Sequence, residues 1–320
     1  MNIQKNCKLL SLLISVLFCA IAPGITLDSI RQAAQQLPKP STMHIVAIEQ
    51  VMDNRISEGN ENTVSQGIKK ANQYVVSEVN IFMDIQSGQA KEIQLDLRDI
   101  NRLMTQFKIP NEKLNKINLT QSKIMLFKGG NSMIYTANMQ DITLWKSDIL
   151  PENLFDSAAN GIIPEHILNS KGDINVMEYQ VDGNKLVKIE IAYKTGINII
   201  VECDPSIGYR YRSIKWLFNG QTTNEKIASD YREVDGIYYP FLFVRRSYSE
   251  SGNIEYEYTL SVEEIRFGIK LMPDDFKIFA PPGTQITDLL VSQTASKIGT
   301  GRYLGIDDVI AIGRNRLQRQ

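Results

Sequence analysis

Short alternating segments separated by turn dipeptides fill most of the second half of the chain, from Gly172 to about residue 263. Turn sequences such as Asp182-Gly183, Asn219-Gly220 and Asp235-Gly236 recur at short intervals, and these are the dipeptides that two-residue hairpin loops prefer. Such short loops join only antiparallel neighbours, because a parallel crossover needs about a dozen residues or more. The chain is therefore predicted to be mainly β, with an antiparallel sheet.

The segment 253–263 shows the alternation most clearly, because apolar side chains occupy every second position from Ile254 to Val262 and polar ones lie between them. One face of this strand is expected to be buried and the other to meet water. Pro240, inside another predicted strand, marks an edge or a bulge. The other strands are predicted at 42–52, 73–86, 90–97, 123–128, 132–137, 186–193, 197–203, 209–218, 226–234 and 237–248.

A few short helices interrupt the strands. Apolar residues recur at helical spacing over 27–37, where Pro38 follows, and again over 151–158 and 164–168. The stretch 99–117 also carries one apolar helix face, and 53–70 reads as a polar loop. The two helices near the middle of the chain are the natural cover for one side of the sheet.

Residues 1–24 have the three parts of a secretory signal peptide. Two lysines precede an apolar stretch that ends at Ile21, and small residues precede the expected cleavage site before Ile25. The mature protein is therefore expected to be exported. Two alternatives stay open: lipid attachment at Cys19, although Phe18 is not the small residue expected before such a cysteine, and retention as an anchor, although the apolar run is shorter than the ~20 residues of a spanning helix.

Charge and cysteine content exclude several classes of function. Without residues 1–24, which hold two lysines and no acid, 33 basic and 36 acidic residues give a net charge of −3. This balance gives no electrostatic reason to bind nucleic acid. The mature chain keeps one cysteine, Cys203, so it can form no internal disulfide, and the end of an apolar strand suits it as a small buried side chain.

Few residues are suited to catalysis. His44 and His166 are the only histidines, and neither accompanies a nucleophile motif or a metal-ligand spacing. The acidic pairs Asp274-Asp275 and Asp307-Asp308 lie in no calcium-loop pattern. We therefore predict a protein that is not an enzyme and that uses no metal and no cofactor.

Aromatic side chains cluster on the predicted sheet and its helices, and some of them are candidates to line a ligand cavity. The alternative is that they fill a closed core, since core packing produces the same pattern. Arginines beside these rings, Arg210 and Arg212 above all, with Arg245 and Arg246, are candidates to hold an anionic head group; exposed arginines on an outer sheet face are the alternative. The cavity candidates are Trp145, Phe155, Tyr211, Trp216, Phe241 and Phe243.

Four motifs resemble the C-terminal half of the LolA/LolB-like superfamily of periplasmic outer-membrane lipoprotein-sorting proteins, over about a quarter to a third of the chain. They are Asp204-Pro205-Ser206-Ile207-Gly208-Tyr209, the stretch from Asp230 to Pro240, Pro273-Asp274-Asp275-Phe276 and Pro281-Pro282-Gly283-Thr284. The resemblance implies an α+β fold in which a strongly curved antiparallel sheet forms an open half-barrel and short helices cap its concave face.

The resemblance also implies a function. It indicates a periplasmic, non-catalytic carrier or binder of an apolar ligand, either a lipid or the acyl chains of a lipoprotein, with an envelope sensor or protein-interaction module as the alternative. The expected organisation is a signal peptide at 1–24, one half-barrel domain at 25–290 and a basic tail at 291–320. That tail either docks on the domain or frays, and it is where an envelope protein would bind.

Overall fold

We describe a computed structural model of the chain that covers residues 25–54, 73–95, 117–119, 123–136, 139–147, 152–290 and 294–317. The predicted signal peptide, most of the predicted polar loop 53–70 and the apolar helix face within 99–117 lie outside these residues. No helix in the described part of the chain combines the length and the apolar character needed to cross a bilayer.

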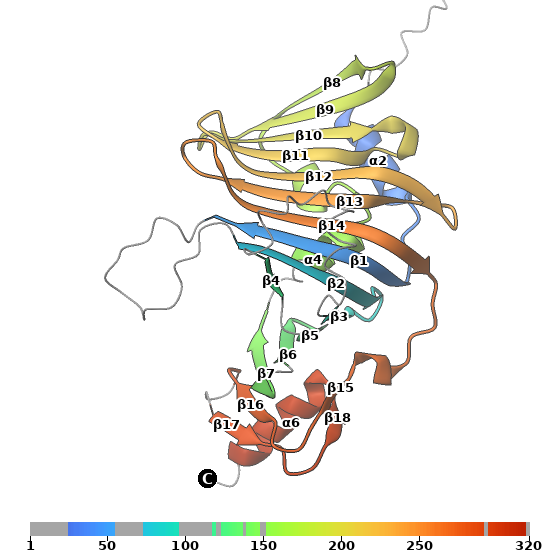
Figure 1. The fold of residues 1–320 in the computed structure, drawn as a ribbon. Coiled ribbons are helices and arrows are strands. Elements are labelled where there is room, and N and C mark those ends of the chain that lie inside the picture. The colour runs from blue at the N-terminus through green and yellow to red at the C-terminus, as the bar shows by residue number, and fades with distance from the viewer. Residues whose placement is uncertain are drawn as a thin grey trace, which may run out of the picture.

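One large, mostly antiparallel sheet dominates the fold (Figure 1). The first strands of the chain form a meander that extends outward from β1. Two short helices, α4 (Glu152–Ala159) and α5 (Glu165–Leu168), then connect it to the opposite edge of the sheet. The strands of this first meander are β1 (Thr42–Asp53), β2 (Gln73–Asp84), β3 (Gln89–Leu95), β5 (Lys123–Lys128), β6 (Asn131–Thr136) and β7 (Asp141–Lys146).

A second meander begins at the far edge of the sheet and returns to the first. Its last strand pairs with β1 along its length, so the two meanders form one sheet. Predicted turns at Asp182, Asn219 and Asp235 are confirmed, each with a positive φ of about 50° and a glycine after it. The strands are β8 (Asp173–Val181), β9 (Asn184–Ala192), β10 (Ile197–Asp204), β11 (Arg210–Phe218), β12 (Gln221–Val234), β13 (Ile237–Tyr248) and β14 (Ile254–Phe267).

The expectation of a purely antiparallel sheet is wrong at two places. The short strand β4 (Ile117–Leu119) runs parallel to β2, and β16 (Gln285–Asp288) runs parallel to β7. Both strands come after connections that are long enough for a parallel crossover. The rule that short turns join antiparallel strands therefore does not apply to them. Pro240 pairs with Tyr231 on one side and lies beyond the β13–β14 ladder, which starts at Leu242, so it takes the edge-like position that proline requires.

Three helices cover one face of the sheet, which we call the inner face. Figure 1 shows α2 (Leu27–Gln36) and α4 on this same side. Ile30 of α2, Leu154 of α4 and Ile167 of α5 are buried against sheet residues such as Ile45 and Leu260. Burying each such side chain stabilises the fold by about 1.5–3 kcal/mol. The helices therefore close the apolar part of the inner face.

The C-terminal segment packs against the outer strands of the first meander, near β7 (Figure 1). Leu304 and Val309 are buried beside Leu126, Ile142 and Leu144 of the main sheet. Residues 294–317 therefore dock, and the alternative of a frayed tail is wrong for them. The division of the chain at residue 290 stays a prediction. The elements are η5 (Pro273–Phe276), β15 (Ile278–Ala280), β16, β17 (Thr294–Lys297), β18 (Arg302–Leu304) and α6 (Ile306–Leu317).

The end of α4 meets the sheet through a close backbone contact. The Tyr211 N–H donates to the carbonyl of Gly161 at 2.8 Å, and the Tyr231 hydroxyl donates to the carbonyl of Tyr211 at 2.6 Å. Gly161 has a φ of +71°, and a Cβ there would lie 2.1 Å from the Tyr231 hydroxyl oxygen. Only glycine satisfies both the backbone conformation and the space at this junction.

We predict that Gly161→Ala destabilises the protein far more than Gly236→Ala. Gly236 has a similar φ of +76° and nothing within 4 Å of a Cβ, so its variant measures the cost of the left-handed conformation alone, about 1–2 kcal/mol. Urea unfolding of the two variants checks this. Equal midpoints would show that Tyr231 moves aside freely and that the close contact has no cost.

The docking of α6 has a similar test. Val309 is 0 % exposed, so Val309→Asp would bury an unpaired carboxylate and is expected to release the C-terminal segment at a cost of about 3 kcal/mol or more. Ala311→Asp, on the exposed side of the same helix, is the control. Hydrogen exchange should rise in α6 for the first variant only; equal exchange in both would contradict the docking.

Candidate functional site

The inner face changes character along its strands. On β1, period-two alternation places Met43, Ile45, Ala47 and Glu49 on this face. The first three are buried under the helices, whereas Glu49 begins a polar region of buried carboxylates, a tyrosine and an arginine. Two adjoining pockets lie in this region, and we describe them as the Trp216 pocket and the acidic pocket.

The Trp216 pocket has a volume of about 520 Å³ and lies where a bulge after Trp216 interrupts the β11–β12 ladder. Ile197 and Phe218 are 41 % and 51 % exposed, so apolar side chains face solvent here. Lys226 and Arg245 lie beside them. This volume is within the roughly 300–1,000 Å³ of small-molecule sites. The lining residues are Ile197, Trp216, Leu217, Phe218, Thr223, Asn224, Glu225, Lys226 and Arg245.

The acidic pocket has a volume of about 260 Å³ and shares Arg245 with the Trp216 pocket. Its walls come from both meanders and from α4. Arg245 and Tyr256 are only partly buried, whereas the three carboxylates are buried, with Glu92 only 1 % exposed. The lining residues are Glu49, Glu92, Gln94, Met125, Asp156, Arg245, Tyr256 and Tyr258.

Glu49 is held by neutral donors. Its Oε2 accepts hydrogen bonds from the Ser77 hydroxyl at 2.9 Å and from the Gln94 amide at 2.6 Å. Burial raises the pKa of the Glu49 carboxyl, and these hydrogen bonds and the charge of Lys123 offset only part of that rise. The site therefore stabilises the charged carboxylate less well than water does.

Asp156 connects α4 to the sheet. Its Oδ1 accepts from the ammonium of Lys226 at 2.6 Å, and both side chains are mostly buried. Burial raises the pKa of Asp156, although the charge of Lys226 and its hydrogen bond act in the opposite direction. The Lys226 ammonium also lies 5.4 Å from the ring centre of Phe155. This ion pair joins the two pockets, because Lys226 lines one and Asp156 the other.

Tyr258 lines the acidic pocket, and its hydroxyl is buried without a hydrogen-bond partner among the described residues. The side chain is 7 % exposed. Burial raises its pKa well above the ordinary value, and the negative charges of Glu49, Glu92 and Asp156 raise it further. All three carboxylates are therefore close enough to act on this phenol, which keeps its proton and has free hydrogen-bonding capacity.

The predicted cavity aromatics separate into three groups. Tyr211, Phe241 and Phe243 are buried in the closed core under the helices. Trp216 lines the Trp216 pocket, and Phe155 lines a smaller apolar pocket of about 260 Å³ beside α4 and α5 while its ring contacts Lys226. Trp145 lies partly buried on β7, on the face opposite to the buried Ile142 and Leu144. The structure therefore brings Trp216 and Phe155 together through Lys226.

The predicted head-group arginines lie elsewhere. Arg210 is 1 % exposed, burial lowers its pKa, and its Nε and Nη1 have no hydrogen-bond partner among the described residues. Arg212 donates to Asp204 at 2.6 Å. Burial alone would raise the pKa of Asp204, but hydrogen bonds from Ser206 and Arg212 leave it lowered. Of the arginines named from the sequence, Arg245 lines both pockets, and a head-group role for Arg210 and Arg212 stays a prediction.

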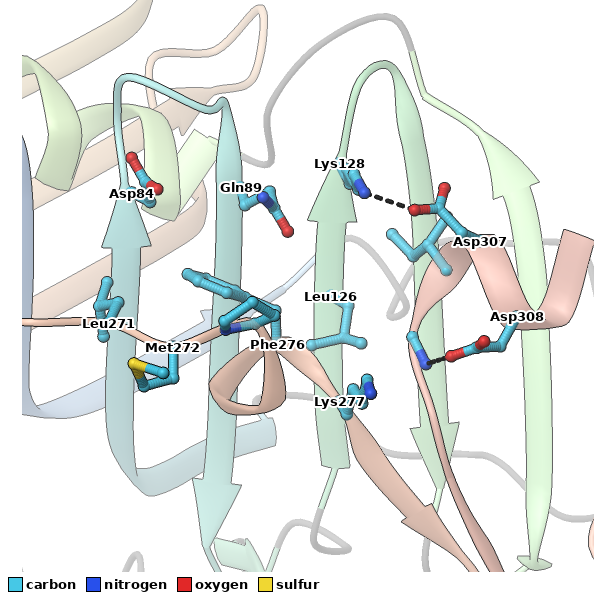
Figure 2. A pocket seen from close by; sticks show the side chains of 13 residues that line it. Asp84, Gln89, Leu126, Lys128, Leu271, Met272, Phe276, Lys277, Asp307 and Asp308 are labelled. Carbon is cyan, nitrogen blue, oxygen red and sulfur yellow. Dashed lines mark hydrogen bonds and ion pairs between the residues drawn. The ribbon is translucent and has the colours of Figure 1, made fainter.

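A third pocket, of about 440 Å³, lies where the C-terminal segment meets the main sheet, and Figure 2 shows its side chains. Lys128 pairs with Asp307, and Asp308 accepts from the Gly305 N–H at 2.8 Å. Nearby, the Lys91 ammonium donates to the carbonyl of Lys277 at 2.9 Å. These charged groups form ion pairs or hydrogen bonds with one another or with the backbone. We therefore interpret this pocket as part of the contact between the C-terminal segment and the main sheet.

The groups considered for catalysis from the sequence are dispersed. His44 stacks on Phe82 with ring centres 4.3 Å apart, and His166 is exposed on α5. Cys203 is buried, as predicted, and burial raises the pKa of its thiol to about 12. Within the described ranges, no group of three or more His, Cys, Asp or Glu side chains is placed to hold a metal ion.

The acidic pocket was not predicted from the sequence. A signal for it exists, because Glu49 has the same phase as Met43, Ile45 and Ala47 and follows directly on a largely apolar run that ends at Ile48. A charge in the buried phase of a strand is unusual and indicates either a paired charge or a site. The partners of Glu49 come from distant strands, and no local pattern predicts them.

No protein-family model and no curated protein matches the chain. Among solved structures, it is similar to a LolA superfamily protein from Nitrosomonas europaea, with 12% identity and a TM-score of 0.40 over 79% of this chain and 97% of that one. It is also similar to a DUF1329 family protein from Desulfovibrio piger, with 9% identity and a TM-score of 0.43 over 77% of this chain and 93% of that one.

We predict that the stability of the protein depends on pH through Glu49. A raised pKa in the folded state favours folding below the ordinary value of 4.5, and this contribution is lost as the pH rises through the folded pKa. The unfolding free energy of Glu49→Gln, relative to the natural protein, should therefore increase between pH 4.5 and 8. Urea unfolding across this range measures it.

Glu190 provides a control of opposite sign. Its hydrogen bond with Lys188 lowers its pKa, so its contribution to stability is present above the ordinary value and is lost as the pH falls through the folded pKa. The relative stability of Glu190→Gln should decrease slightly as the pH rises. If the stability of Glu49→Gln relative to the natural protein does not change with pH, burial does not raise the pKa of the Glu49 carboxyl.

Proposed function

We propose that the protein is an exported, non-catalytic binder or carrier of an apolar ligand, either a lipid or a lipoprotein acyl chain, and that the ligand's apolar part occupies the Trp216 pocket. The observation that carries this proposal is a pocket of about 520 Å³ in which Ile197 and Phe218 are half-exposed beside Trp216. Each methylene buried there contributes about 0.8 kcal/mol. A chain of several methylenes therefore binds without a metal or a covalent bond.

The position of this pocket in the fold supports the same proposal. Trp216 and Ile197 continue the apolar inner face beyond the part that α2, α4 and α5 cover. We propose that the sheet curves around these helices as an open half-barrel and that the Trp216 pocket is its accessible end. The resemblance of the sequence motifs to lipoprotein-sorting proteins supports an apolar ligand, and the pattern of residues 1–24 supports export to the periplasm.

Phe218→Glu should weaken the binding of an uncharged apolar dye such as N-phenyl-naphthylamine by about tenfold or more, because a carboxylate in the pocket must be desolvated when the dye binds. Phe279→Glu is the matched control, since Phe279 is 49 % exposed and lies on β15, away from the pocket. Dye fluorescence measures both affinities.

Native mass spectrometry of residues 25–320, purified without detergent, complements the dye measurement. A bound lipid mass that Phe218→Glu removes would support the proposal. A protein that is free of lipid and takes up no dye would contradict it, and would favour the alternative of an envelope protein-interaction module.

A further inference from the structure

The acidic pocket brings together three buried carboxylates and a tyrosine whose hydroxyl has no hydrogen-bond partner among the described residues. We propose that it binds the ammonium group of a primary alkylamine whose chain lies in the Trp216 pocket; this inference rests on the proposed function. The ligand class is therefore a cationic or amine-bearing amphiphile.

The carboxylates and the cations at the pocket are equal in number, and it is the deep burial of the carboxylates that favours a cationic ligand over an anion. Glu49, Glu92 and Asp156 face the pocket, and the cations around them are Lys123, Lys226 and Arg245. Despite these cations, burial leaves the pKa of Glu49 and of Asp156 raised. A ligand ammonium would stabilise both carboxylates in their charged form, whereas an anionic head group would raise their pKa further.

The geometry suits an ammonium better than a metal ion. Among the described residues, no three acidic, histidine or cysteine side chains are placed to coordinate a metal. An alkylammonium has three N–H donors on one side, and it can bind carboxylates that are spread around a pocket of about 260 Å³. Hydrogen bonds of this charge-assisted kind are about twice as strong as neutral ones.

Tyr258 provides the second, independent indication. Its buried hydroxyl has no partner among the described residues, and a buried polar group without a partner costs stability. Glu49, Glu92 and Asp156 all act electrostatically on this phenol, so it lies close to the three carboxylates. There it can accept a hydrogen bond from a ligand N–H.

The two pockets adjoin and share side chains. Arg245 lines both, and the Lys226–Asp156 ion pair, at 2.6 Å, lies between them. An amphiphile with its amine in the acidic pocket would place its alkyl chain against Trp216 and Phe218. The phase of the strands supports this path, because Lys226 pairs with Arg245 across the β12–β13 ladder on the inner face.

The test compares three probes of equal chain length, dodecylammonium, dodecanol and dodecanoate, by calorimetry, below the micelle concentrations of the two ions and below the solubility limit of dodecanol. Dodecylammonium should bind about tenfold more tightly than the other two. Tyr258→Phe and Glu49→Gln should each weaken dodecylammonium binding about tenfold and weaken dodecanol binding far less. Tyr258→Phe is expected to fold normally, because it removes a hydroxyl that has no partner.

Tyr303→Phe, on the exposed strand β18, is the matched control and should keep the preference. Equal binding of the three probes, or tighter binding of dodecanoate, would overturn the ammonium site and leave the proposed function standing. Binding of none of them would overturn both. An undiminished preference for dodecylammonium in both Tyr258→Phe and Glu49→Gln would show that the amine binds elsewhere and would also overturn the assignment.

Discussion

The antiparallel ladder between β1 and β14 is the constraint on which the rest of the structure depends. It pairs Met43 with Phe267 at one end and Asp53 with Tyr256 at the other, and so joins segments that are some two hundred residues apart in the chain. Without it, the two meanders would be separate sheets with exposed edges. The inner face exists as one continuous surface because this ladder closes the seam between them.

The acidic pocket lies across this seam. Glu49 comes from β1 and Glu92 from β3 in the first meander, whereas Tyr258 and Arg245 come from β14 and β13 in the second. Asp156 is added by α4, which connects the two meanders. A buried group of carboxylates is costly for stability, and a well-packed apolar cluster would cost less. The acidic pocket is therefore a place where both meanders and α4 contribute charged side chains.

Local patterns in the sequence predict the strands and turns well, because alternation and turn dipeptides act over a few residues. Asp204 and Asp230 belong to motifs recognised in the sequence, and the structure gives these motifs physical roles: Asp204 caps the short helix Pro205–Ile207, and Tyr231 holds Tyr211 at the end of α4. The parallel pairing of β16 with β7 and the grouping of Glu49 with Asp156 depend on contacts between distant segments. No local rule reaches them.

The predicted aromatic residues show the same limit. Phe241 and Phe243 have the same alternating pattern as Trp216 and Phe218, and the sequence makes no distinction between them. What separates them is the length of the helices: α2, α4 and α5 are short and cover only the part of the inner face that contains the two phenylalanines. The strands extend beyond this cover, where Trp216 lines one pocket, and Glu49 lines another at the edge of the cover, beside α4. The two pockets therefore exist because the strands are longer than the helices that cover them. Their chemistry differs because the inner-face residues change from apolar to charged along the same strands.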